Sequence, residues 1–505
     1  MSGCAQLHHR AGWLLSALLA LWAASAQAAP AAQATTDVPA PVQAALDQAG
    51  LPATALGVVA YPLPDEGART GGKMMHRRTA ALRWQAEQAM APSSSIKILT
   101  AVVALDRLGA GTRGRTELLT EGPPDAEGRL AGPLYLRGGA DAQLDWGALW
   151  LMLRQAREQG VREVPAGLVL DRSLFRPARP EPTLPPFDEY PESAYNVVPD
   201  ALLLNGNLIG LSLESDSQTL RGRLSPAWRG LQLDLSALAW SERPCADWEL
   251  DFGRPQLLPA PEGQGWRLRL QGSFPRQCQQ RQDMSLVDRQ ALVPLVLRSL
   301  WEELGGSLGP AVQEAATPAG AQLLAQHQDR PLGELLRGAL KSSDNPLTRL
   351  VYLRLGASVA RPGEETLAAA DRAVREWLAE QGLDAQGLVL ENGSGLSRRE
   401  RIRPELLAAV LARAARLPLA PELQSGLPLA GVDGTLRRRL KASPAAGRAR
   451  LKTGSLNEAV ALAGYVPDRQ GRPWVLVAFV NHEQAGRRGR PVLDAVADWV
   501  ARQSP

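Results

Sequence analysis

One stretch of the chain, residues 96–108, is hydrophobic on nearly every side when it is drawn as a helix. Such a helix is stable in water only when other elements cover it all round, so the stretch predicts a buried helix. Pro92 and three adjacent serines lie just before it, and the glycine-rich residues 109–111 end it. The fold must therefore enclose this segment.

Ser94 and Lys97 lie at the start of this helix, three residues apart and therefore on one face. A neutral lysine amine can take the proton of a serine hydroxyl, which activates the serine as a nucleophile. Burial and a second nearby cation both lower the pKa of a lysine, so Lys452 could help Lys97 to act as the base. The chain has no other S-x-x-K match. The alternative is that Ser94 is an ordinary helix cap.

A second short motif, Ser343-Asp344-Asn345, matches the pattern S-x-N and supplies a hydroxyl and an amide. It directly precedes Pro346 and an apolar run, which places it at the start of a helix. Taken alone, the motif is equally well explained as a pair of residues that caps this helix.

A third motif, Lys452-Thr453-Gly454, lies at the start of a predicted β-hairpin. A strand in this position can present backbone groups to an extended substrate, and Lys452 can bind a substrate carboxylate. The N–H groups of Ser455 and Ser94 could together hold an oxyanion. The alternative is that Lys452 has no role in binding and is an ordinary basic residue on the edge strand of a sheet.

Other kinds of site find little support in the sequence. No histidine belongs to an H-E-x-x-H pattern, and the cysteines are too few for a zinc finger. The formal charge of +4 is small for 505 residues, and no basic cluster is interleaved with aromatic residues. We therefore predict no metal, no cofactor and no nucleic-acid partner.

The hydrophobic pattern divides the chain into parts of different character. Residues 29–112 contain the first strands and the buried helix, whereas residues 113–283 contain short β-like runs between glycine and proline turns. Helical patterns return after Ser285, and three strands and a last helix complete residues 284–505. We predict a catalytic domain in two parts, 29–112 and 284–505, interrupted by β-rich inserted domains.

The N-terminus predicts export. Residues 11–24 form an apolar run of secretory length, and Ala26-Gln27-Ala28 offers a small-x-small cleavage site, so residues 1–28 are predicted to be a signal peptide. An uncleaved anchor is the alternative, although the run is short for a bilayer. The pair Cys245 and Cys278 remains after cleavage and predicts one disulfide in an oxidising compartment, with two free thiols as the alternative.

The motifs together resemble one family closely. PSSSIK at 92–97, SSDNPL at 342–347, NGSGLSR at 392–398, LPLAGVDGTL at 427–436 and LKTGSL at 451–456 are similar to the class C low-molecular-mass penicillin-binding proteins, which are D-alanyl-D-alanine carboxypeptidases and endopeptidases. About 250 residues separate Lys97 from Ser343, which favours this group over compact β-lactamases. The resemblance implies an α/β (α+β) transpeptidase domain of penicillin-binding-protein/β-lactamase type, with helices packed on an antiparallel sheet.

The resemblance also implies a role for each motif residue. Ser94 attacks the carbonyl of the penultimate D-Ala and forms an acyl-enzyme, Lys97 is the general base, and Ser343 relays a proton to the leaving amine. The residues implied in substrate binding are Asn345, Arg398, Lys452, Thr453, Gly454 and Ser455.

The implied setting is the periplasm, where the partners are peptidoglycan stem peptides and β-lactam antibiotics that acylate Ser94. No integral membrane span is expected once the signal peptide is removed. Two alternatives stay open, a serine β-lactamase and a non-catalytic protein that binds the cell wall. A β-lactamase needs a dedicated group to activate the deacylating water, and the sequence offers none that we can identify.

Overall fold

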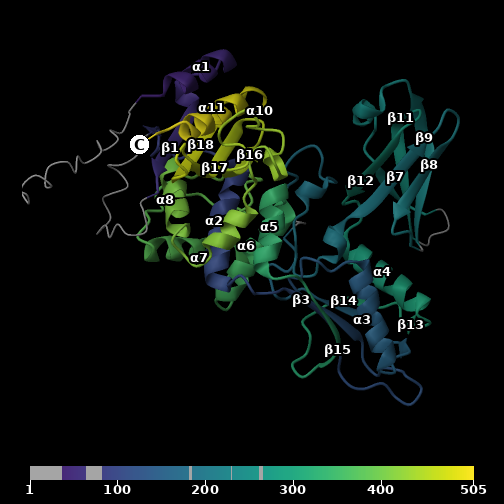
Figure 1. The fold of residues 1–505 in the computed structure, drawn as a ribbon. Coiled ribbons are helices and arrows are strands. Elements are labelled where there is room, and N and C mark those ends of the chain that lie inside the picture. The colour runs from purple at the N-terminus through teal and green to yellow at the C-terminus, as the bar shows by residue number, and fades with distance from the viewer. Residues whose placement is uncertain (1–36, 64–81, 181–184, 229, 261–264, 505) are drawn as a thin grey trace, which may run out of the picture.

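A computed structural model describes residues 37–63, 82–180, 185–228, 230–260 and 265–504 of the chain. The predicted signal peptide, residues 1–28, lies outside these ranges. Figure 1 shows a compact part that contains both ends of the described chain, and an extended part beside it built from the middle of the sequence.

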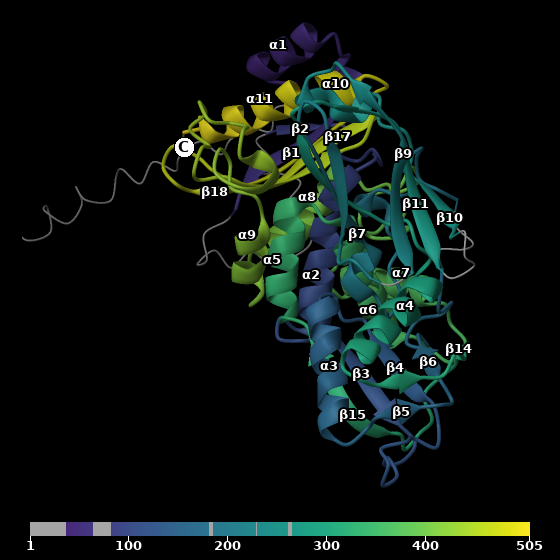
Figure 2. The same ribbon diagram turned by 90° about the vertical axis from the view of Figure 1, so that its right-hand side faces the viewer.

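The compact part is built on a five-stranded antiparallel sheet with the order β16-β17-β18-β1-β2. Its strands are β1 (Leu56–Pro62), β2 (Leu82–Trp84), β16 (Arg450–Ser455), β17 (Ala459–Pro467) and β18 (Pro473–Asn481). β17 and β18 are buried along almost their whole length. Their sequences lack the polar alternation of a half-exposed strand because helices cover both faces of the sheet (Figures 1 and 2).

The helices form two layers around this sheet. The first layer packs its own apolar cluster against the sheet and consists of α1 (Ala40–Ala49) and α11 (Arg490–Ala501), with the short α10 (Ala485–Arg488) beside it. The second layer surrounds α2 (Lys97–Leu108) and comprises α5 (Leu332–Ser342), α6 (Asn345–Val359), α7 (Thr366–Glu380), α8 (Pro404–Ala414) and α9 (Ala420–Gly426).

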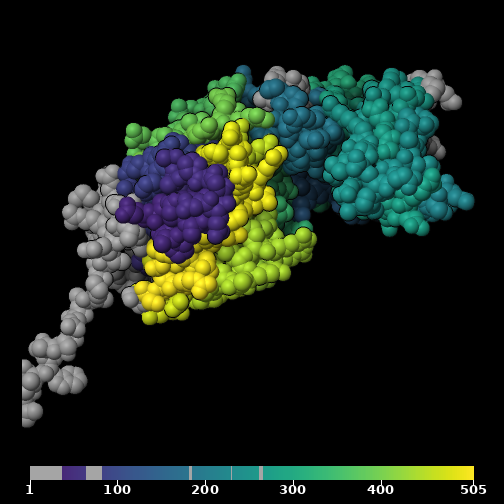
Figure 3. All heavy atoms as spheres, turned by 90° about the horizontal axis from the view of Figure 1, so that it is seen from above, coloured from purple at the N-terminus to yellow at the C-terminus, as the bar shows by residue number. Residues whose placement is uncertain are grey.

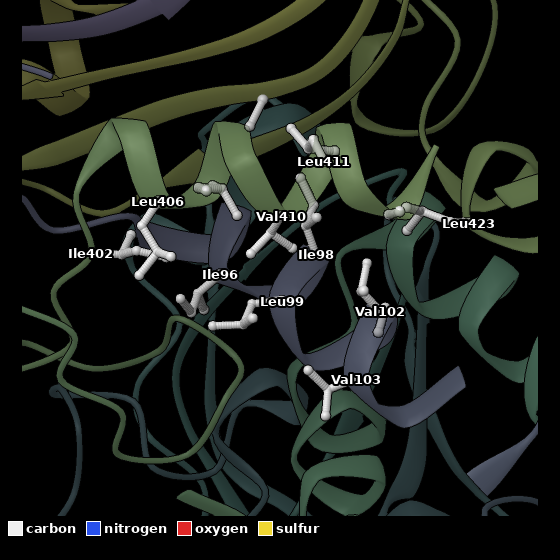
Figure 4. Close-up of a cluster of buried hydrophobic side chains, with 14 of the residues drawn as sticks. Ile96, Ile98, Leu99, Val102, Val103, Ile402, Leu406, Val410, Leu411 and Leu423 are labelled. Carbon is white, nitrogen blue, oxygen red and sulfur yellow. The ribbon is translucent and has the colours of Figure 1, made fainter. Parts of the chain in front are cut away.

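The helix α2 is enclosed as its composition predicts. Every residue from Lys97 to Leu105 is buried, and Figure 4 shows Ile98, Leu99 and Val102 among the apolar side chains of the neighbouring helices. Burying so many aliphatic side chains contributes about 1.5–3 kcal/mol for each one. The core thereby holds in one position the start of α2, which carries Lys97, and the turn just before it, which carries Ser94.

The extended part contains two groups of strands that share one apolar cluster. The inner group is a five-stranded sheet, β14-β6-β4-β3-β15, with α3 (Trp146–Glu158), α4 (Arg289–Glu303) and the short pair β5 (Glu163–Val164) and β13 (Ser307–Leu308). Its strands are β3 (Arg115–Thr120), β4 (Leu134–Gly139), β6 (Leu168–Asp171), β14 (Val312–Glu314) and β15 (Gln322–Gln328).

The outer group consists of two three-stranded sheets, which form the separate lobe seen from above in Figure 3. The strands are β7 (Ile209–Ser215), β8 (Leu220–Ser225), β9 (Leu231–Ser241), β10 (Gln256–Pro259), β11 (Trp266–Pro275) and β12 (Gln279–Met284). The predicted disulfide between Cys245 and Cys278 is formed in this lobe.

The structure differs from the sequence prediction at two places in the insertion. A helix, α3, lies within the stretch predicted as β-rich, and its N-cap Asp145 accepts a hydrogen bond from the N–H of Ala148. The boundary predicted at residue 283 is too early, because β14 and β15 pair with β6 and β3. Five of the seven residues of β15 are at least partly exposed, so this strand lacks the apolar alternation that would have marked it.

None of the helices within the described ranges has both the length and the apolar character that crossing a lipid bilayer requires.

Candidate active site

Ser94 and Lys97 lie where a short 3₁₀ turn, Ser93–Ile96, passes into α2. The turn places the Lys97 Nζ atom 3.1 Å from the Ser94 Oγ atom. The Lys97 side chain is fully buried, whereas Ser94 is partly exposed. The structure thus brings the two residues of the S-x-x-K motif together, with the hydroxyl toward solvent and the amine behind it.

The Lys97 amine has two further partners, both of them carbonyl oxygens. It donates to the Oδ1 atom of Asn345 at 2.7 Å and to the backbone oxygen of Ser394. Burial lowers the pKa of Lys97 well below its usual range, and the charge of Lys452 lowers it further. Both effects favour the neutral form of the amine.

The S-x-N motif lies at the junction of two helices. Ser343 ends α5 in a left-handed conformation with φ of 64°, and Asp344 caps α6 by accepting a hydrogen bond from the N–H of Leu347. This sharp turn directs Ser343 and Asn345 to the same side of α2. The Nδ2 atom of Asn345 donates to the carbonyl oxygen of Tyr195, which belongs to the inserted part.

The K-T-G motif lies on β16, the terminal strand of the described sheet. Gly454 passes so close to the nucleophile that a Cβ atom there would lie 2.8 Å from the Cβ of Ser93 and 2.9 Å from the nitrogen of Ser94. Thr453 donates a hydrogen bond from its hydroxyl to that of Thr435. A side chain at position 454 would therefore push β16 away from the start of α2.

Lys452 lies behind the other residues of its motif. Its side chain is fully buried, and its Nζ donates to the Ser343 Oγ and to the Thr453 carbonyl oxygen, at 2.8 Å in each case. Burial lowers the pKa of Lys452 to about 7. Among the described residues, Ser343 and Thr453 line the adjacent cleft and Lys452 does not, so the charge of Lys452 reaches the cleft through Ser343.

All these groups surround an open cleft with a volume of about 1170 Å³. Ser94, Ser343, Asn345, Thr453 and Ser455 line one side of it. The cleft thus exposes the hydroxyl groups and amide that the three motifs contribute.

The inserted part supplies another wall of the cleft, which includes Phe187, Asp188 and Tyr195. Arg398 also lines the cleft, where its guanidinium lies 5.4 Å from the centre of the Phe187 ring and donates to the Phe187 carbonyl oxygen. Because the ring and the guanidinium support each other, Arg398 is held at the wall.

Several residues around the site have no motif of their own in the sequence. Ser394, whose carbonyl accepts from Lys97, lies within the NGSGLSR segment, and Thr435 lies within LPLAGVDGTL. The similarity of these two segments to a family could have pointed to them. The wall at Phe187 and Tyr195 lies in a proline-rich stretch, and no pattern there indicates contact with a helix 150 residues later.

Comparison with known proteins gives matches along most of the chain. Residues 63–503 match the model of the D-Ala-D-Ala carboxypeptidase 3 (S13) family. The chain is 29% identical over 431 residues to a D-alanyl-D-alanine carboxypeptidase of Actinomadura sp. (strain R39), a match that covers 82% of this chain and 78% of that protein. It is 26% identical over 431 residues to the D-alanyl-D-alanine carboxypeptidase DacB of Haemophilus influenzae, covering 83% of this chain and 87% of that protein.

The fold is also similar to a solved structure. The crystal structure of penicillin binding protein 4 from Haemophilus influenzae superposes with a TM-score of 0.72 at 22% sequence identity, and the match covers 92% of this chain and 99% of that chain. At this level of identity the likeness concerns the fold. It confirms the predicted penicillin-binding-protein/β-lactamase-like architecture.

Proposed function

This chain belongs to the D-Ala-D-Ala carboxypeptidase 3 (S13) family, and on that premise we propose that it is a serine-type D,D-peptidase of peptidoglycan that forms an acyl-enzyme on Ser94. The observation that carries the proposal is the contact between the Ser94 hydroxyl and a buried lysine amine whose pKa is lowered. Such an amine loses its proton more readily than an exposed lysine and can serve as a general base.

The first step is the activation of Ser94. A neutral amine has two N–H groups and one lone pair. The partners of Lys97 at Asn345 and Ser394 are carbonyl oxygens, which can accept a hydrogen bond but cannot donate one. When both N–H groups point to these oxygens, the lone pair faces the Ser94 hydroxyl. Lys97 takes the hydroxyl proton while Ser94 Oγ bonds to the carbonyl carbon of the penultimate D-Ala. The N–H groups of Ser94 and Ser455 hold the oxyanion.

The second step is the loss of the terminal D-Ala. Because Lys452 donates to Ser343 Oγ, the hydroxyl proton of Ser343 is free to point into the cleft. Ser343 gives this proton to the leaving amine as the C–N bond breaks, and the hydrogen bond from Lys452 stabilises the Ser343 oxygen that remains. The proton that Lys97 took from Ser94 then returns to Ser343 through water in the cleft. Water then releases the acyl group from Ser94.

Substrate binding is assigned to the groups that line the cleft. Thr453 and Ser343 bind the terminal carboxylate, and Lys452 supports it electrostatically from behind. The Nδ2 group of Asn345 holds an amide carbonyl of the acyl chain, Arg398 contacts the chain further along the wall, and Gly454 lets β16 run close to Ser94.

We propose that the substrates are stem peptides in the periplasm and that crosslinked peptides are cleaved as well. The cleft is larger than the roughly 300–1,000 Å³ of an ordinary small-molecule site, which leaves room for the second peptide of a crosslink. β-Lactams would acylate Ser94 as covalent inhibitors. In support, a structure of the Haemophilus influenzae protein that matches with a TM-score of 0.70 is a complex with a β-lactam.

The test is covalent labelling with fluorescent penicillin, followed by product analysis on purified muropeptides. We expect labelling of the wild type, its loss in Ser94→Ala, and release of D-Ala together with cleavage of crosslinked dimers. Persistent labelling of Ser94→Ala would contradict the proposal. Rapid turnover of penicillin without D-Ala release would indicate a β-lactamase, and binding of muropeptides without acylation would indicate a non-catalytic protein.

A further inference from the structure

Glu400 is a carboxylate that none of the motifs includes, and it is only 1% exposed. It lies just after the loop 391–396 and accepts hydrogen bonds from the backbone N–H groups of that loop. Its Oε1 atom accepts from Asn392 at 3.0 Å and from Gly393 at 2.8 Å, and its Oε2 atom accepts from Gly395 at 3.0 Å. One buried side chain thus accepts hydrogen bonds from most of the backbone N–H groups of the turn.

The carbonyl groups of the same loop point the other way, toward α2. The Gly393 oxygen accepts from the Thr100 hydroxyl at 2.7 Å, and the Ser394 oxygen accepts from Lys97. Gly395 lies against the nucleophile, since a Cβ atom there would be 2.0 Å from the carbonyl oxygen of Ser93. The loop is therefore clamped between Glu400 on its N–H side and the start of α2 on its carbonyl side.

This clamp fixes one of the two oxygens that orient the Lys97 amine. Asn345 supplies one acceptor from α6, and its side chain is held by Tyr195. The other acceptor is the Ser394 backbone oxygen, and its position depends on the loop. If that oxygen moves, an N–H group of Lys97 is freed to turn toward Ser94, and the lone pair turns away from it.

We propose that Glu400 is a positioning residue for the reaction, which holds the Ser394 carbonyl so that the lone pair of Lys97 faces the Ser94 hydroxyl. The inference rests on the proposed role of Lys97 as the base. Glu400 acts through the loop and does not touch the substrate, so it is not itself a catalytic residue.

Glu400 also has an electrostatic effect that separates this role from simple support of the fold. Four charged groups act on the Lys97 amine besides its burial. Lys452 and Arg349 lower its pKa, whereas Glu400 and Asp344 raise it. Removing the charge of Glu400 therefore lowers the pKa of Lys97 further, and the amine stays neutral to a lower pH.

The experiment measures the rate constant of acylation by fluorescent penicillin between pH 5 and pH 9. In Glu400→Gln we expect the plateau rate to fall by about 100-fold, since a misplaced general base costs about that much. We also expect the acid limb of the profile to move to lower pH. In Glu400→Asp, which keeps the charge on a shorter arm, we expect a smaller loss of rate with the acid limb unmoved.

Glu391→Gln is the matched control, because Glu391 lies on the same loop, accepts from the Ser397 hydroxyl and is partly exposed. It should behave like the wild type. A wild-type rate in Glu400→Gln, or a reduced rate with an unmoved acid limb, would overturn the proposal. If Glu400→Gln fails to fold, a wild-type rate in Glu400→Asp overturns it instead. Persistent labelling of Ser94→Ala is a different outcome, which removes the proposed function and leaves Glu400 as a structural clamp.

Discussion

Replacing Lys452 with Met tests how burial determines the charge of this amine. Methionine has a similar length and no charge, so Lys452→Met keeps the packing behind Ser343 and removes the group that titrates. The pKa of Lys452 is about 7 in the folded protein, because the side chain is entirely buried, against 10.5 for an exposed lysine. The unfolded chain therefore binds a proton between pH 7 and pH 10.5 that the folded protein does not bind.

The size and sign of the effect follow from this difference. A lysine whose pKa is lowered on folding destabilises the fold at low pH, and the cost decreases as the pH rises above the folded pKa. The shift of 3.5 pH units from 10.5 to 7 corresponds to a cost of about 5 kcal/mol at pH 6 and about 2 kcal/mol at pH 9. Lys452→Met should therefore gain stability relative to the wild type at pH 6, and about 3 kcal/mol of that advantage should be lost by pH 9.

The assay is urea denaturation of both proteins at pH 6, 7.5 and 9, followed by tryptophan fluorescence. The loss of the hydrogen bonds to Ser343 and Thr453 costs roughly 1 kcal/mol each. This loss lowers the free energy of unfolding by the same amount at all three pH values, so the test rests on how the difference between the two proteins changes with pH. Lys441→Met replaces an exposed lysine and should give a constant difference from the wild type. If Lys452→Met also gives a constant difference, Lys452 is not desolvated as the structure has it, and the reasoning is refuted.

Three further predictions concern the site and the inserted lobe. Ser343→Ala should lower the rate of D-Ala release by 100-fold or more through loss of the proton relay, as measured by steady-state kinetics, and an unchanged rate would exclude the relay. Gly395→Ala should abolish penicillin labelling, because its Cβ would lie 2.0 Å from the Ser93 oxygen; wild-type labelling would show that the loop can move away. Cys278→Ser should destabilise the outer lobe by about 2–4 kcal/mol in calorimetry, yet leave labelling of Ser94 intact; loss of labelling would show that the lobe and the cleft are coupled.

Much of the compact part could be predicted from the sequence because its elements carry strong local signals. The helix at residues 96–108 follows from an all-round apolar pattern, and the structure buries every residue from Lys97 to Leu105. The three strands predicted near the end of residues 284–505 correspond to β16, β17 and β18. In these segments the local pattern and the tertiary environment agree, so a short window of sequence contains the necessary information.

The inserted part was harder to predict because its pairing is non-local. β15 meets β3 across about 200 residues, and β14 meets β6 across about 140. These short, partly polar strands are held by their partners in the sheet, and their own sequences favour no particular structure. Their assignment therefore depends on contacts that a window of sequence does not contain.

At the candidate site, too, some features can be predicted from the local sequence and others depend on the tertiary structure. The motifs place Ser94, Lys97, Ser343 and Asn345 at one predicted site, and in the structure these residues lie around the same two lysine amines. The sequence assigns Lys452 to a substrate carboxylate, and the structure adds that this amine is buried and donates to Ser343. Residue type and spacing identify which groups can react, whereas depth below the surface decides their charge. Because this depth is set by the packing of β16 against the turn Ser93–Ile96, the protonation states at this site are a property of the whole fold.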